Sequence, residues 1–161
     1  REVNIVELLK DLGFVASFKG SKGYIKLDHP DLILEFLVPE KGRGTDKPYP
    51  LPKLGINAVA LRFLNFLSSN TIRVKVENFY LILPHPANFA LHKLIIFQRR
   101  IKKEKAIKDR KAAIEILNAL INKGDSRIIR NVFNSVLLKW QKKIIRGLET
   151  LKEKKILEVI K

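Results

Sequence analysis

The chain has 161 residues, an apolar fraction of 46% and a formal net charge of +16. It contains no cysteine, which excludes disulfides and thiolate metal sites, and no run of about 18 apolar residues that would span a membrane. No secretory signal pattern opens the sequence, so a soluble cytoplasmic protein is expected.

The first part of the sequence indicates one helix followed by short strands. The helix ends at Gly13, and the sequence GSKG at 20–23 is typical of a hairpin turn. The predicted elements are a helix over 3–12, strands over 15–18, 24–27 and 32–38, and a long polar loop over 39–52. A loop of that length is often functional.

Glu35 interrupts an apolar strand. The run 32–38 (LILEFLV) is typical of a strand covered on both faces, and Glu35 shares its face with Ile33 and Leu37. A buried carboxylate is unfavourable unless a cation, a metal ion or a strong donor meets it. Glu35 is therefore a candidate site residue.

The second part of the sequence is mostly helical. The predicted elements are a helix over 58–67, strands over 72–76 and 79–83, and helices over 87–102, 105–122, 126–143 and 144–161. Strands followed by helices indicate an α+β fold, with a small mixed or antiparallel sheet and a C-terminal helical bundle. We expect a sheet-containing part, 1–83, and a basic helical part, 84–161.

Lys93 lies on a predicted helix that is apolar on nearly every side. At 100° per residue it falls between Phe89 and Ile96 on one side and Phe97 on the other. Arg100, seven residues on, lies on the same stripe. A lysine in such surroundings either snorkels to solvent or meets a carboxylate or phosphate, which makes Lys93 and Arg100 candidate phosphate-binding residues.

Asp109 and Arg110 fall inside the apolar arc of the next predicted helix. Asp109 lies between Ile116 and Leu120 on the helical wheel, and Arg110 lies near Leu117. Both side chains are therefore expected to point inward. Two interpretations stay open, a salt bridge that only fixes helix packing and a functional site.

Positive charge is concentrated late in the chain. Residues 1–97 carry 13 Lys/Arg and 9 Asp/Glu, whereas residues 98–161 carry 19 Lys/Arg and 7 Asp/Glu, a net charge of +12. Six basic residues crowd one end of two consecutive predicted helices: Arg99, Lys102, Lys103, Lys105, Lys108 and Lys111. They form either a nucleic-acid-binding face or a solvated lysine-rich surface.

Several stretches together resemble a known family. They are 34–39 (LEFLVP), 55–58 (GINA), 83–94 (LPHPANFALHKL), 98–100 (QRR) and 108–110 (KDR). These stretches resemble the later portion of a bacterial nucleotidyltransferase family of the DNA polymerase β-like superfamily, related to the abortive-infection toxin nucleotidyltransferases. The resemblance covers about residues 13–120, and 84–94 is its most specific part.

The resemblance implies a partial nucleotidyltransferase fold and transfer of a nucleoside monophosphate from an NTP to an RNA or protein acceptor. It matches Glu35 to a carboxylate that holds Mg²⁺, Lys93 to a lysine that contacts the triphosphate, and Asp109 to a carboxylate of the following helix. Glu35, Lys93 and Asp109 are thus the candidate catalytic residues, and they are expected to converge in one cleft.

The family pattern also includes a Gly-Ser turn and an Asp-x-Asp pair, which this sequence lacks. Because the chain begins with Arg1 and has no methionine, we expect that this segment lies upstream and that the chain alone forms an incomplete two-metal site. The alternatives are a non-catalytic, basic nucleic-acid-binding module and a structural partner of another chain.

Overall fold

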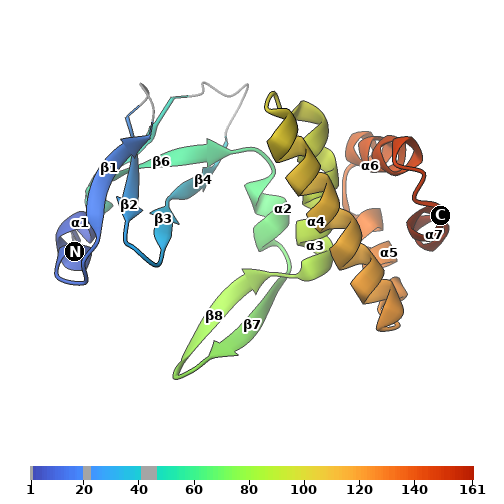
Figure 1. The fold of residues 1–161 in the computed structure, drawn as a ribbon, viewed down its shortest axis with the longest axis horizontal. Coiled ribbons are helices and arrows are strands. Elements are labelled where there is room, and N and C mark those ends of the chain that lie inside the picture. The colour runs from blue at the N-terminus through green and yellow to red at the C-terminus, as the bar shows by residue number, and fades with distance from the viewer. Residues whose placement is uncertain (1, 20–22, 41–46) are drawn as a thin grey trace. The chain divides into compact units, whose positions relative to one another are not determined.

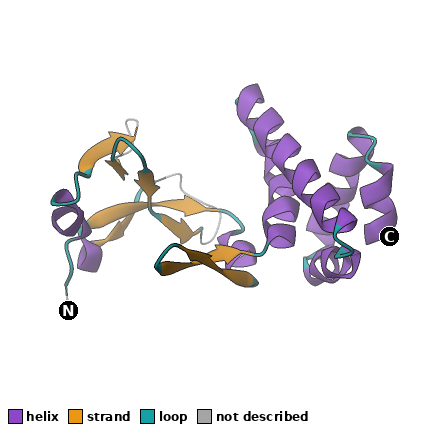
Figure 2. Ribbon diagram, turned by 60° about the horizontal axis from the view of Figure 1, so that its bottom comes forward, coloured by secondary structure: helices purple, strands orange, loops and turns teal. Residues whose placement is uncertain are grey.

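The computed structural model describes residues 2–19, 23–40 and 47–161 (Figure 1). The predicted turn residues 20–22 and the loop residues 41–46 lie outside the described residues. The chain folds as two compact units, Arg1–Leu64 and Asn65–Lys161, whose positions relative to each other are not determined. Strands dominate the first unit and helices the second (Figure 2).

The first unit contains two small sheets and a capped helix. Asn4 caps the helix α1 (Ile5–Lys10) by accepting from the backbone N–H groups of Val6 and Glu7. The strands β1 (Val15–Lys19), β2 (Tyr24–Asp28) and β3 (Ile33–Glu35) form an antiparallel sheet. In the second sheet, β6 (Ile56–Leu61) lies between β4 (Leu37–Pro39), which is parallel to it, and β5 (Tyr49–Leu51), which is antiparallel. A short 3₁₀ turn, η2 (Pro52–Leu54), links β5 to β6.

The predicted covered strand at 32–38 is wrong in one respect. The run is divided at Phe36, because its first half pairs with β2 and its second half pairs with β6. Glu35 is exposed, and its face neighbours Ile33 and Leu37 are 55% and 45% exposed. Each half is a short edge strand, so the apolar run does not imply cover on both faces.

The predicted helix at 58–67 is also wrong. Its first half belongs to β6, the central strand of its sheet, where Ile56 and Ala58 are buried. Phe63, with a φ of 65°, separates β6 from the short helix α2 (Leu64–Ser68). A short apolar run is ambiguous between strand and helix, and here pairing on both sides decides for the strand.

The second unit is a helical assembly with one β-hairpin. Its hairpin consists of β7 (Thr71–Val76) and β8 (Phe79–Pro84). Its helices are α3 (Pro86–Ile96), the 3₁₀ turn η3 (Phe97–Arg99), α4 (Lys103–Asn122), α5 (Ser126–Ser135), α6 (Leu138–Thr150) and α7 (Lys154–Ile160). The predicted helix 126–143 is two helices, broken where Val136 and Leu137 take extended backbone angles.

Helix α3 is central to the second unit, since it packs against α4, α5 and α6. Leu91, Leu94 and Ile95 are fully buried, which explains why α3 is apolar on nearly every side. Strands followed by helices confirm the α+β class. The division into compact units falls before the hairpin rather than after it, because Asn70 accepts from the backbone N–H of His85 and so ties the hairpin to α3.

In the part of the chain that the structure describes, helices are too short or too polar to cross a membrane.

The end of α6 generates a stability prediction. Lys152 has a φ of 57°, and the backbone N–H of Glu153 donates to the carbonyl oxygen of Leu148 in a Schellman-type end. Replacing Lys152 with glycine should raise the free energy of unfolding by about 0.5–1 kcal/mol, because glycine adopts this conformation without strain. Thermal unfolding followed by circular dichroism measures the change.

The matched control is Lys142→Gly, the same substitution at an exposed position inside α6. It should lower the free energy of unfolding by about 1 kcal/mol. A lower melting temperature for Lys152→Gly would contradict the strain argument.

Candidate functional site

The segment that opens α3 is fixed by side-chain capping. The Nδ1 atom of His85 accepts from the backbone N–H of Ala87 at 3.1 Å. Asn88 is 2% exposed and donates from Nδ2 to the carbonyl oxygen of Phe66 at 2.9 Å, while its Oδ1 accepts from Asn70 at 3.2 Å. These bonds hold the first turn of α3 against the end of α2 and so set the direction of the whole helix.

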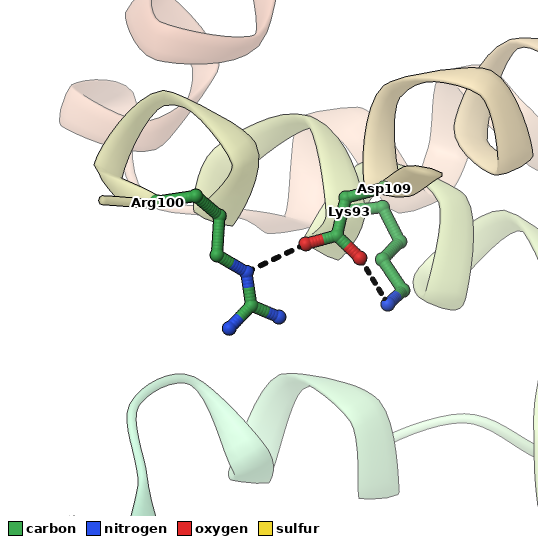
Figure 3. A network of polar contacts seen from close by, with 3 residues as sticks. All are labelled: Lys93, Arg100 and Asp109. Atoms are coloured by element: carbon green, nitrogen blue, oxygen red, sulfur yellow. Dashed lines mark hydrogen bonds and ion pairs between the residues drawn. The ribbon is translucent and has the colours of Figure 1, made fainter. Parts of the chain in front are cut away.

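Asp109 joins two cations from the preceding elements (Figure 3). The Nζ atom of Lys93, in α3, lies 2.5 Å from Oδ1 of Asp109, and the Nε atom of Arg100 lies 2.7 Å from Oδ2. The Asp109 side chain, supplied by α4, is only 6% exposed. One buried carboxylate therefore fixes two basic side chains that are seven residues apart.

The pKa of Asp109 reflects two opposing effects. Burial alone would raise the pKa of this carboxyl, but the hydrogen bonds and positive charges of Lys93 and Arg100 outweigh burial and hold the pKa below its ordinary value. Asp109 is thus ionised at neutral pH. Two positive charges face one negative charge, so the cluster of Lys93, Arg100 and Asp109 has an excess charge of +1.

The two cationic groups reach solvent although the carboxylate does not. The side chains of Lys93 and Arg100 are 21% and 37% exposed, and their charged ends project to the same side of Asp109 (Figure 3). Arg100 uses only its Nε atom, and among the described residues Asp109 is the only carboxylate that either cation binds. The terminal guanidinium nitrogens, which point away from Asp109, are placed to bind an anion.

The structure brings some of the predicted site residues together and leaves others apart. Lys93, Arg100 and Asp109 meet, as the helical periodicity indicated. Glu35 lies in the other unit, so its convergence with them stays a prediction. Arg110 is exposed, and its predicted inward orientation is wrong, because Ile107 on the same side of α4 is itself 53% exposed.

The six basic residues at the end of α3 and the start of α4 are all exposed: Arg99, Lys102, Lys103, Lys105, Lys108 and Lys111. Lys111 makes a 3.9 Å contact with Glu115, and both side chains are largely solvated. These residues flank Arg100 in sequence, so positive charge is continuous along this part of the chain. Their proposed role in nucleic-acid binding remains a prediction.

Two polar residues of α3 were missed by the sequence argument. Asn88 and His92 are 2% and 3% exposed, inside the apolar surroundings of the helix. The signal that identified Lys93, a polar residue on a helix that is apolar all round, applies equally to both.

A magnesium site cannot be built from the described residues alone. Across residues 2–19, 23–40 and 47–161 no group of three or more His, Cys, Asp or Glu side chains could hold a metal ion. Asp109 already accepts from two cations, which leaves it poorly suited as a ligand. The described donor set therefore does not fit the two-metal arrangement that the resemblance implies.

A family model described as nucleotidyltransferase matches residues 2–134. The chain belongs to this nucleotidyltransferase family. No curated protein and no solved structure matches the chain. The family segment contains Lys93, Arg100 and Asp109, and it ends before α6 begins.

The ion cluster generates a pH-dependent prediction. Asp109→Asn should lower the free energy of unfolding by about 2–4 kcal/mol at pH 7, because two cations then face a neutral amide in a part-buried site. Since folding lowers the pKa of Asp109, its stabilisation is complete above the unfolded pKa of about 3.9 and is lost as the pH falls through the folded value.

Urea unfolding at a series of pH values measures this effect. The difference between parent and variant should be constant from about pH 5 to 8 and shrink below about pH 4. Glu149→Gln, which removes an exposed carboxyl from α6, is the control and should change little at any pH. A gap that persists undiminished at low pH would show that the ion pairs are not its cause.

Proposed function

We propose that the second unit of this chain binds the phosphates of a nucleoside triphosphate through Lys93 and Arg100, for transfer of a nucleoside monophosphate to an RNA acceptor. The observation that carries the proposal is the excess of cations at one buried carboxylate. The family match supports the reaction type and an NTP substrate.

The two cations suit different parts of a phosphate chain. The ammonium of Lys93 is a compact charge with three rotatable donors, whereas the guanidinium of Arg100 offers a planar fork that can bind two oxygens at once. In nucleotidyl transfer an acceptor oxygen attacks the α-phosphorus, the bond from that phosphorus to the bridging oxygen breaks, and pyrophosphate leaves. Fixed positive charge beside the β- and γ-phosphates stabilises the negative charge that develops on the leaving group.

Asp109 serves as a positioning residue in this proposal. Its carboxylate restricts both cations before any anion binds, which reduces the ordering that binding requires. Because its pKa is lowered, Asp109 is not a general base near neutral pH. The assignments of Glu35 as a metal ligand and of Mg²⁺ as cofactor remain implications of the resemblance, and no step here is routed through the ion.

The charge of the second unit supports a polyanionic acceptor. Residues 65–161 carry 22 Lys/Arg and 8 Asp/Glu, a net charge of +14, whereas residues 1–64 carry 10 and 8, a net charge of +2. The exposed basic residues beside Arg100 could contact an RNA backbone while its end lies near the bound phosphates. The rival proposal is a module that binds nucleic acid without catalysis.

Removing either cation should weaken nucleotide binding. Lys93→Gln and Arg100→Gln are each expected to lower the affinity for ATP about tenfold, because each removes one charge-assisted hydrogen bond to phosphate. Titration of a fluorescent ATP analogue measures the affinity. Lys123→Gln removes an exposed charge at the other end of α4 and is the matched control. Equal losses in all three variants, or no binding by the parent, would overturn the phosphate site.

RNA binding should depend strongly on salt. Each phosphate contact with single-stranded RNA gives a log–log slope of about −0.7, so a few contacts predict binding that largely vanishes by about 0.3 M salt. Replacing Lys102, Lys103 and Lys105 together by Gln should reduce both affinity and slope in a fluorescence-anisotropy titration. If this triple variant binds RNA as tightly as the parent, the basic residues form only a solvated surface.

A further inference from the structure

The turn that carries Arg100 is held in place from α6. Gln98, in η3, donates from Nε2 to the carbonyl oxygen of Leu94 in α3 and to that of Lys143 in α6, both at 2.8 Å. One amide group therefore ties the end of α3 to α6 two residues before Arg100. Both bonds depend on the donor hydrogens of the amide.

Close approach of α6 to this turn requires a glycine. Gly147 is buried, and a Cβ atom built on it would lie 3.1 Å from the Nε2 atom of Gln98 and 3.1 Å from the Cε1 atom of Phe97. These distances are shorter than ordinary van der Waals contacts, so a larger residue would displace the turn. Glycine in a helix interior is otherwise unfavourable by about 1 kcal/mol relative to alanine, which is consistent with a packing reason for it here.

Displacement of the turn would pass directly to Arg100. The backbone N–H of Arg100 donates to the carbonyl oxygen of Phe97 at 3.2 Å, and Arg100 itself has extended backbone angles. Its side chain reaches Asp109 through the single Nε hydrogen bond. A small rotation of η3 would therefore break the contact, while the pair formed by Lys93 and Asp109, made from α3 and α4, would remain.

We propose that Gln98, held between α3 and α6, is a positioning residue for Arg100, and that α6 thereby supports the anion site although it lies beyond the family-matching segment 2–134. The identity of the anion as nucleotide phosphate rests on the proposed function. The positioning of Arg100 by Gln98 rests on the hydrogen bonds and the close packing at Gly147.

The experiment is a double-mutant cycle of Gln98→Met and Arg100→Gln in the full chain. Methionine keeps the length of the side chain and removes both donors. The first readout is the pKa of the Asp109 carboxyl, measured by ¹³C NMR titration, which needs no nucleotide. Gln98→Met should raise this pKa in the parent, because Arg100 no longer holds the carboxylate, and should leave it unchanged in the Arg100→Gln background.

The second readout is the affinity for the fluorescent ATP analogue. Gln98→Met should lower it about threefold to tenfold in the parent and have no further effect when Arg100 is absent. Gly147→Ala provides an independent perturbation and should shift both readouts in the same direction as Gln98→Met.

Gln141→Met is the matched control. Gln141, also in α6, donates to the carbonyl oxygens of Phe133 and Val136 at 3.2 and 3.1 Å, away from Arg100. It should affect thermal stability but neither the pKa of Asp109 nor ATP affinity.

The outcomes separate this inference from the proposed function. Equal effects of Gln98→Met with and without Arg100, or equal effects of Gln141→Met, would mean that Gln98 acts on general packing, and the positioning role would be overturned. If the pKa of Asp109 responds as expected while ATP affinity is insensitive to every variant, the positioning role stands and the phosphate-binding proposal fails.

Discussion

A carboxylate with 6% of its side chain exposed cannot carry its charge without close partners, and in this chain the partners come from two different elements. On a continuous α-helix, Lys93 and Arg100 would be separated by roughly 10 Å along the axis. They reach the two oxygens of one carboxylate because α3 ends at Ile96 and the 3₁₀ turn η3 brings Arg100 back toward α4. The position of Asp109 therefore depends on how α3 ends, and the end of α3 depends on α6.

The second cation distinguishes this cluster from a structural ion pair. One cation would neutralise Asp109, and many buried ion pairs contribute little net stability compared with apolar packing. Adding Arg100 leaves an excess of positive charge, with both cationic ends exposed on one side (Figure 3). An arrangement selected only for stability would gain little from that exposed excess, whereas an anion-binding site requires it.

Helical periodicity was sufficient to identify the cluster before its geometry was known. Lys93 and Asp109 each break the apolar pattern of a long helix, where 3.6 residues per turn define a face reliably. Glu35 broke a strand pattern in the same way, but the strand is short and divided, and the residue is exposed. A run of seven apolar residues does not reveal whether both of its faces are covered.

Other features depend on tertiary contacts that no local pattern encodes. The apolar run at 58–67 fits a helix as well as a strand, and only its pairing with β4 and β5 decides between them. Gln98 in sequence is one polar residue in a basic stretch, and Gly147 is one glycine within a helix. Their importance arises because α6 approaches η3, which requires residues 45 or more positions apart to be placed first.

The functional and family boundaries of this chain need not coincide. The family match ends at residue 134, yet the carbonyl oxygen of Lys143 and the open face at Gly147 hold the turn that presents Arg100. The second unit must also tolerate a net charge of +14, which opposes compaction by self-repulsion. Binding of a polyanion would relieve that repulsion and stabilise the same packing that positions the cations. Anion affinity and stability of the helical assembly are therefore expected to be linked, with α6 connecting the two.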